Sequence, residues 1–319
     1  MLVHPTTRRP LPPRLPQGST IVRGGNDVLV VIDGVAVLVH DAVAYCARHR
    51  DAIIAAVVRA DGDAHDAAAL VDACAQSLPS AEPATPFVSD YTDAEAEDEP
   101  PPALVDDALA ALLDDGSTPL SWLIARAPAA DVVVELGPGA GALSSLLAPR
   151  ARRRFIVVDL ALPAVLIARA KARAALAASA QRRVVGIVAD AADLPLADGA
   201  ADVVVASNVV DAVDDPRGAI AEAARALRPG GRLLLTTPRP HLHERGADGA
   251  DAPLREALAD SGLEVVEWHD GLRWPRVHSD RHVELWTCVG VVALKRAASA
   301  RRGAKAGGTR PRAGAARSR

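Results

Sequence analysis

The sequence has few of the residues that stabilise small proteins through covalent or metal cross-links. Its three cysteines, Cys46, Cys74 and Cys288, are odd in number and widely spaced. This pattern predicts neither a disulfide framework nor a metal site. We therefore expect buried thiols that play no part in cross-linking.

Long apolar runs are also absent. No stretch approaches the roughly 18 residues needed to span a bilayer. Residues 1–17 carry no apolar core between their arginines and prolines, unlike a signal peptide. We therefore expect a cytoplasmic protein without a membrane partner, in which residues 1–18 are a flexible arm.

Charge of one sign is missing from two long stretches. The net charge of −4 excludes a globally basic nucleic-acid binder. Residues 60–125 contain acids but no lysine or arginine, and residues 295–319 contain bases but no acid. We interpret the proline-rich, acidic residues 79–102 as an interdomain linker, and residues 297–319 as a disordered basic tail. Nucleic-acid contacts are expected only weakly, through this tail.

Residues 19–78 are predicted to form a small α+β domain. Asp33-Gly34 between two apolar runs is the strongest short-range signal for a β-hairpin. The predicted elements are two strands followed by two helices, at residues 28–32, 35–39, 41–59 and 63–77. This order and length resemble the winged-helix-like precursor-recognition elements of pathways that modify ribosomally made peptides. The resemblance implies peptide binding, and a plain accessory or dimerisation domain is the alternative.

A glycine-rich turn lies at the centre of the chain. Residues 131–136 are predicted to form a buried parallel strand, and residues 142–147 an opening helix. Between them stand three glycines that would let a ligand approach the main chain closely: Gly137, Gly139 and Gly141. Their spacing differs from the G-x-G-x-x-G of dinucleotide sites. Glu135 precedes them, and its carboxylate would repel a diphosphate but form a charge-assisted hydrogen bond with an ammonium group.

Three further apolar runs predict parallel strands that end in polar residues. They are residues 155–158, 184–188 and 201–207. Asp159 follows the first run, at the distance from the glycine loop where α/β nucleotide sites place the acid that binds ribose hydroxyls. Asp190 and Ala191 follow the second run, and Asn208 follows the third.

Together these motifs resemble the class I S-adenosylmethionine-dependent methyltransferases of the type 11 group. Glu-x-Gly-x-Gly-x-Gly is similar to the family's first motif, and residues 227–232 are similar to its Leu-x-Pro-Gly-Gly turn into a fifth strand. The resemblance implies an α/β, Rossmann-like sheet, mostly parallel with an antiparallel last strand and flanked by helices, over residues 103–296. It also implies that residues 263–268 and 283–294 are the antiparallel pair that closes the sheet, around a loop at residues 269–282.

The cofactor that the resemblance implies is S-adenosylmethionine. Glu135 and the glycine loop are implied to hold its amino-acid end, and Asp159 its ribose. Asp190 and Ala191 are implied to contact the adenine, and Asn208 completes the implied cofactor-binding set.

The catalytic candidates are acid and histidine side chains near the transferred methyl group. Methyl transfer from a sulfonium is an in-line displacement, but amine and hydroxyl acceptors must also lose a proton. Asp211, after the fourth strand, is predicted either to contact the acceptor or to cap a helix. His241, after the fifth strand, is the second candidate, with a solvated loop histidine as the alternative.

Two motifs that define nucleic-acid methylases are missing. Ser207-Asn208-Val209-Val210 stands where amide methylases carry Asn/Asp-Pro-Pro-aromatic, and no cysteine follows a proline. The predicted acceptor is therefore an N or O atom of a small molecule or peptide, including a ribosomally made peptide natural product. One rival hypothesis is a binding protein that keeps the cofactor cleft without catalysis. Another is an NAD-dependent oxidoreductase, which Glu135 and the glycine spacing disfavour.

Overall fold

The computed structural model describes residues 1–24, 27–78, 118–238, 251–279 and 282–296. Three predictions fall outside these residues. They are the linker at 79–102, the candidate His241 and the tail at 297–319.

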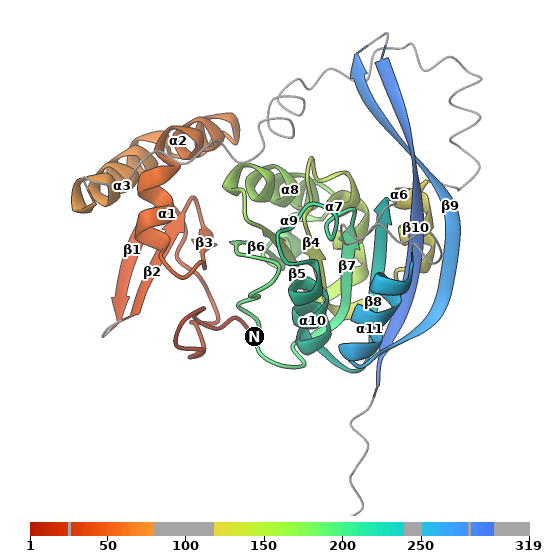
Figure 1. The fold of residues 1–319 in the computed structure, drawn as a ribbon. Coiled ribbons are helices and arrows are strands. Elements are labelled where there is room, and N and C mark those ends of the chain that lie inside the picture. The colour runs from red at the N-terminus through yellow and green to blue at the C-terminus, as the bar shows by residue number, and fades with distance from the viewer. Residues whose placement is uncertain (25–26, 79–117, 239–250, 280–281, 297–319) are drawn as a thin grey trace, which may run out of the picture.

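One ten-stranded sheet runs through the described part of the chain (Figure 1). The strands are β1 (Thr20–Gly24), β2 (Asp27–Ile32), β3 (Val35–Val37), β4 (Ala130–Leu136), β5 (Ala151–Asp159), β6 (Val184–Val188), β7 (Ala201–Ser207), β8 (Leu227–Pro238), β9 (Leu263–Ser279) and β10 (His282–Lys295). Their order across the sheet is β1-β2-β3-β6-β5-β4-β7-β8-β10-β9. From β3 to β8 in this order, neighbouring strands pair in parallel, and the pairs at both margins are antiparallel. The predicted Rossmann-like sheet is confirmed.

The parallel strands form where the sequence has near-continuous apolar runs. β6 and β7 have the bounds that the sequence predicts, and β4 and β5 begin earlier than predicted. Such runs favour strands buried on both faces, because side chains alternate between the two sides of a sheet.

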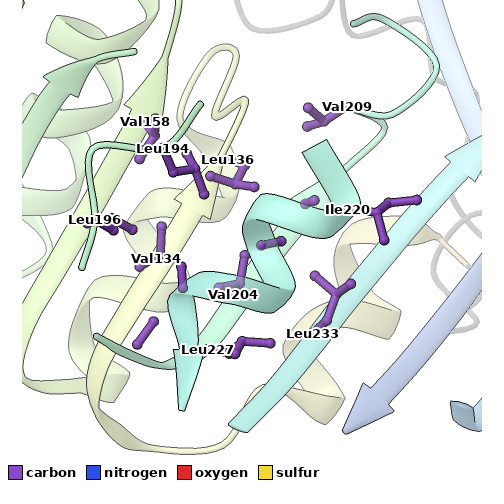
Figure 2. Close-up of a cluster of buried hydrophobic side chains, with 14 of the residues drawn as sticks. Val134, Leu136, Val158, Leu194, Leu196, Val204, Val209, Ile220, Leu227 and Leu233 are labelled. Atoms are coloured by element: carbon purple, nitrogen blue, oxygen red, sulfur yellow. The ribbon is translucent and has the colours of Figure 1, made fainter. Parts of the chain in front are cut away.

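Helices cover both faces of the sheet. The helices are α1 (Ala42–Arg48), α2 (Arg50–Arg59), α3 (Ala64–Ser77), α6 (Pro119–Arg126), α7 (Ala142–Leu147), the 3₁₀ turn η1 (Ala148–Arg150), α8 (Leu162–Ala174), α9 (Ala178–Gln181), α10 (Pro216–Ala226) and α11 (Ala252–Asp260). One core lies under α6, α7 and α8, and another under α10 and α11 on the opposite face. Figure 2 shows the second core, where Ile220 of α10 lies near Val204, Leu227 and Leu233.

Residues 1–18 pack on the sheet, so the prediction of a flexible arm was wrong. Leu2 and Val3 are 6% and 5% exposed, and Leu2 forms a β-bridge to the segment before β7. Leu11 and Leu15 pack against the same core. The physical reason is burial of apolar area, because these side chains cover the face of β2 and β3 opposite to α1, α2 and α3.

Residues 19–78 are joined to the rest of the fold rather than set apart from it. β3 pairs in parallel with β6, so β1, β2 and β3 extend the main sheet. α1, α2 and α3 share a core with α8, to which Leu162, Val165 and Leu166 contribute. Without β3, β6 would present unpaired backbone groups at a sheet edge. The α+β content is as predicted, whereas the winged-helix resemblance stays a prediction.

Within this region the local predictions are partly confirmed. Asp33 and Gly34 have φ values of 47° and 73°, as a type I′ hairpin turn requires. The helix predicted over residues 41–59 is interrupted at His49, whose ring lies 4.8 Å from that of Tyr45 between ring centroids. β1 was not predicted.

The loop predicted at residues 269–282 is mostly strand, which corrects the prediction. β9 continues to Ser279, and β10 pairs with it along its length. A bulge separates the pair of Leu272 and Cys288 from that of His269 and Gly290, with Gly271 at φ 83°. Beyond the bulge Trp274 pairs with Trp286, and a cross-strand aromatic pair stabilises a hairpin.

Candidate cofactor site

The candidate site lies at the carboxyl ends of β4 and β5. The order of the parallel strands reverses at β4, which has β5 on one side and β7 on the other. Ligands of open α/β sheets bind outside the carboxyl ends of the strands at such a reversal. The sequence-predicted residues Glu135, Asp159, Asp190 and Asn208 all lie at this edge, at or after the ends of β4, β5, β6 and β7.

The turn after β4 requires glycine. Gly137, Gly139 and Gly141 have φ values of 59°, 50° and 73°. A Cβ on Gly137 would lie 2.5 Å from Cγ2 of Val209, and one on Gly141 would lie 2.6 Å from Cα of Ala168. Glycine is therefore required in this loop for two reasons, the positive φ values and the close approach of Val209, which follows β7, and of Ala168 on α8. The loop ends in Gly141, the N-cap of α7.

Glu135 is a buried carboxyl group on the strand before this turn. It is 1% exposed, and the hydroxyl of Ser144 on α7 donates to its Oε2 at 2.5 Å. Burial raises the pKa of Glu135 to about 8, with the Ser144 hydrogen bond acting to lower it and the charge of Asp159 to raise it. Sequence reasoning missed Ser144, although its place three residues into the helix after the glycine turn was a usable signal.

Asp159 closes β5 on the same face as Glu135. Burial raises its pKa to about 6, and backbone N–H groups that follow it act to lower the pKa. One of these, the N–H of Ala161, donates to Oδ1 at 2.8 Å. Tyr45 of α1 reaches the same turn, where its hydroxyl donates to the carbonyl of Leu160 at 2.9 Å. The sequence gave no signal of this contact.

Asp190 and Ala191 begin the turn that follows β6. The Asp190 side chain is exposed, and its Oδ1 accepts from the N–H of Ala192 at 2.8 Å. Its carbonyl accepts from the N–H of Asp193 at 3.1 Å. The Asp190 side chain thus stabilises the turn itself, and adenine contact by this pair stays a prediction.

Asn208 and Asp211 follow β7 and contact the end of β8. Asn208 has φ 54°, and its Oδ1 accepts from the Thr236 hydroxyl at 3.2 Å. The Thr237 hydroxyl donates to Oδ1 of Asp211 at 3.3 Å. The N-cap of α10 is Asp215, so the helix-capping alternative for Asp211 is wrong.

Asp211 also influences a cysteine on β10. Burial raises the pKa of Cys288 to about 12, and the charge of Asp211 acts in the same direction. The sequence did not predict that Thr237 and Cys288 lie beside Asp211. Within the described ranges no group of three or more His, Cys, Asp or Glu side chains could hold a metal ion. None of the helices in the described part of the chain is long and apolar enough to cross a membrane.

Comparison with known proteins finds a methyltransferase-domain model that is similar to the part of the chain around this site. Residues 134–235 match the family model described as a methyltransferase domain. The match begins on β4 and ends on β8, so it contains the glycine turn and the ends of β5, β6 and β7.

Two curated relatives are similar to parts of the chain. A malonyl-[acyl-carrier protein] O-methyltransferase of Hahella chejuensis is 48% identical over 50 residues, which is 16% of this chain and 18% of that protein. A protein of Mycolicibacterium smegmatis described as a probable S-adenosylmethionine-dependent methyltransferase is 32% identical over 145 residues, covering 42% of this chain and 52% of the relative. The chain thus spans about half, or less, of the length of these two relatives.

Among solved structures, the N-methyltransferase NodS of Bradyrhizobium japonicum in complex with S-adenosyl-L-homocysteine is similar to 65% of this chain. The similarity covers 97% of NodS, with 20% identity and a TM-score of 0.46.

The residues at the edge of β4 and β5 fit S-adenosylmethionine better than a dinucleotide. Glu135 is buried without a cationic partner among the described residues, and Asp159 adds a second carboxyl group beside it. An ammonium group would offset the cost of burying the Glu135 charge, and ribose hydroxyls could donate to Asp159. A diphosphate would face the Glu135 carboxylate instead, which disfavours the NAD hypothesis.

Proposed function

We propose that this protein is an S-adenosylmethionine-dependent methyltransferase that acts on an N or O atom of a small molecule or peptide. The observation that carries the proposal is Glu135, a buried carboxyl group beside a turn of three positive-φ glycines, with Asp159 at the end of the next strand. The methyltransferase-domain match over residues 134–235 supports it.

The bound cofactor would supply an electrophilic methyl group on a sulfonium. Glu135 and the glycine turn would hold the amino-acid end, while Asp159 would orient the ribose. Asp211 stands at the carboxyl end of β7, where its carboxylate already accepts a hydrogen bond from Thr237. We assign it the role of accepting a proton from the acceptor, or of holding the acceptor in line.

Calorimetry and transfer of a labelled methyl group test this proposal separately. The full chain should bind S-adenosylhomocysteine and should not bind NAD. Incubation with labelled S-adenosylmethionine and a panel of amines, alcohols and peptides should label one acceptor class. Binding without transfer to any of them would favour a binding protein that keeps the cleft. NAD binding in place of S-adenosylhomocysteine would overturn the cofactor assignment.

For the acceptor we propose a peptide, a ribosomally made one included, that residues 19–78 recruit. The edge of β3 is taken by β6, so among the described residues the edge that this region leaves for an added strand is that of β1. Val22 of β1 is 39% exposed. An extended segment pairing there would raise the effective concentration of the acceptor at the cleft.

A charge on the β1 edge tests recruitment. Val22→Glu should raise KM for a long peptide acceptor and leave KM for its short fragment unchanged. Val58→Glu is the matched control, because Val58 is an exposed valine, 58% accessible, on α2 of the same region. Equal effects of Val22→Glu on both substrates would favour a plain accessory role for residues 19–78.

A further inference from the structure

We propose that Arg8, His40 and Tyr45 are positioning residues for the nucleoside half of the cofactor site. All three belong to the N-terminal region, far in sequence from the glycine turn. They bond to the two turns, after β5 and β6, that carry Asp159 and Asp190. The inference rests on the proposed function and extends it to a part of the chain that lies outside the methyltransferase-domain match.

Arg8 and His40 bond to the turn after β6. Nη1 of Arg8 donates to the carbonyl of Leu194 at 3.1 Å and lies 3.5 Å from Oδ1 of Asp193. Nε2 of His40 lies 3.0 Å from the other carboxylate oxygen of Asp193. Both oxygens of the Asp193 carboxylate are therefore contacted by side chains from outside residues 134–235.

Backbone hydrogen bonds also join the first residues of the chain to residues 195–197. The N–H of Val3 donates to the carbonyl of Pro195 at 2.9 Å, and the N–H of Ala197 donates to the carbonyl of Met1 at 2.9 Å. Leu2 is buried between them. The N-terminal segment thus lies along residues 195–197 like an added short strand, and it places Arg8 beside the turn.

From the other side, α10 holds the same turn. Oε2 of Glu222 accepts from the N–H of Leu194 at 2.8 Å, and Nη2 of Arg225 donates to the Leu194 carbonyl at 2.9 Å. The Leu194 carbonyl therefore receives two arginines, Arg225 from α10 and Arg8 from the N-terminal segment. A turn held on both sides has little freedom left to lose when a ligand binds.

The backbone of Arg8 also has an uncommon conformation. Its φ is 55°, in the left-handed region that non-glycine residues rarely occupy. Its N–H donates to the carbonyl of His4 at 2.8 Å, which closes a tight turn. Such conformations persist only where surrounding contacts fix them. The contacts of the Arg8 side chain with Asp193 and Leu194 are therefore interpreted as its structural role.

Tyr45 bonds to the turn after β5 in a corresponding way. Its buried hydroxyl donates to the carbonyl of Leu160 at 2.9 Å and accepts from the N–H of Leu162 at 3.3 Å. Leu160 directly follows Asp159, and Leu162 begins α8. The hydroxyl of Tyr45 therefore sets the path of the chain immediately after the carboxyl group assigned to the ribose.

The consequence is that ligand affinity, rather than the methyl-transfer step, depends on these three side chains. Removing them takes away the contacts on one side of each turn, so the turns move more in the ligand-free protein and binding must then order them. S-adenosylhomocysteine and adenosine should lose affinity by similar factors, because both carry the nucleoside that the two turns would contact.

Arg8→Ala and Tyr45→Phe test the inference by calorimetry on the full chain, with S-adenosylhomocysteine and adenosine as probes. Each variant should bind both probes about five- to tenfold more weakly, which corresponds to about 1 to 1.4 kcal/mol. Alanine keeps the positive-φ strain of Arg8, so the comparison isolates the side chain. Arg9→Ala is the matched control, because Arg9 is 75% exposed and lies 3.9 Å from Asp27, away from the turn; it should bind both probes like the wild type.

The conservative variant Arg8→Lys separates positioning from general stability. Both side-chain contacts of Arg8 come from one nitrogen, so a lysine ammonium can replace them and should restore most of the affinity. Thermal unfolding of the ligand-free variants is measured in parallel. Unchanged affinity in Arg8→Ala and Tyr45→Phe, with or without a lower Tm, would overturn the inference and leave the proposed function standing. Absence of S-adenosylhomocysteine binding to the wild type would overturn both.

Discussion

Glu135 and Asp159 lie on the same face of the sheet at the ends of neighbouring strands. Glu135 pairs in register with Val157, and Asp159 stands two residues further along β5. Because side chains alternate along a strand, both carboxyl groups point toward the α7 side. They are close enough for the charge of Asp159 to raise the pKa of Glu135. A buried Glu135 with a half-buried Asp159 beside it destabilises the empty protein and favours a cationic or hydroxyl-bearing ligand.

The stability of the ligand-free protein should depend on pH through Glu135. Its pKa rises from 4.5 to about 8 on folding, so the folded chain holds a proton that the unfolded chain releases in this window. The contribution of Glu135 to the free energy of unfolding is fully present below about pH 4.5. It is lost as pH rises toward about 8, and the loss is on the order of a few kcal/mol. Glu135→Gln should flatten this slope in urea unfolding measured at several pH values. A slope unchanged in the variant would contradict the raised pKa.

Replacing Asp159 should weaken cofactor binding specifically. A lost hydrogen bond to a charged group costs about 1.5 to 3 kcal/mol, so Asp159→Ala should bind S-adenosylhomocysteine at least about tenfold more weakly. Asp131→Ala is the control, because Asp131 lies near the opposite end of β4 and its side chain forms a long, exposed pair with Arg153. Wild-type affinity in a folded Asp159→Ala protein would remove Asp159 from the site.

The glycine turn offers a test that separates backbone strain from steric contact. Gly137→Ala adds a Cβ 2.5 Å from Val209 at a positive φ, and it should lower stability by the strain of about 1 kcal/mol plus about 1 to 3 kcal/mol for overpacking. Gly262→Ala adds a Cβ at φ 72° with nothing within 4 Å, so it should show the strain alone. Equal losses of stability in the two variants would mean that Val209 moves aside freely.

The central strands and the acids at their ends could be predicted because each is specified by a local pattern. An apolar run such as residues 184–188 predicts a strand buried on both faces without reference to its neighbours. The three glycines of the turn likewise indicate a backbone with positive φ. The pairing of β3 with β6 could not be predicted, because it is a contact between segments about 150 residues apart that no local pattern specifies. The same holds for the contacts of Arg8 and Tyr45 with the two turns.

The error over residues 1–18 has a similar cause. Prolines and arginines outnumber the apolar residues there, so composition favours a flexible arm. Leu2 and Leu11 nevertheless find an apolar face on β2 and β3 that the sequence left without an assigned cover. Burial of a few side chains against this surface is what makes residues 1–18 pack on the sheet. The composition of these residues contains no information about that surface.

Asp211 should affect turnover rather than cofactor affinity. Asp211→Asn keeps an acceptor for the Thr237 hydroxyl but removes the charge and the proton-accepting capacity. We expect kcat to fall about 10²-fold or more and the affinity for S-adenosylhomocysteine to stay within about twofold. Asp214→Asn, an exposed neighbour, is the control and should keep full activity. Unchanged kcat in Asp211→Asn would limit Asp211 to its contact with Thr237.

The attachment of the N-terminal region should depend on a buried ion pair between Asp33 and Arg169. Arg169 of α8 has a side chain that is 8% exposed, and its guanidinium donates to both the carboxylate and the carbonyl of Asp33 in the β2–β3 turn. Asp33→Asn keeps a residue that tolerates positive φ but leaves the arginine buried without its counter-charge, which costs about 3 to 5 kcal/mol. Urea unfolding measures this loss. Asp61→Asn is the matched control, because Asp61 also has a positive φ, of 53°, but is exposed. This variant should change the free energy of unfolding by less than about 0.5 kcal/mol.

A second substitution shows whether the loss comes from the unpaired charge. Arg169→Met in the Asp33→Asn background removes the buried guanidinium and keeps a long apolar side chain on α8 against β6. It should recover most of the lost stability, because replacing a whole buried pair costs little compared with breaking it. If the double variant is as unstable as Asp33→Asn alone, the turn geometry at Asp33, and not its charge, joins the N-terminal region to α8.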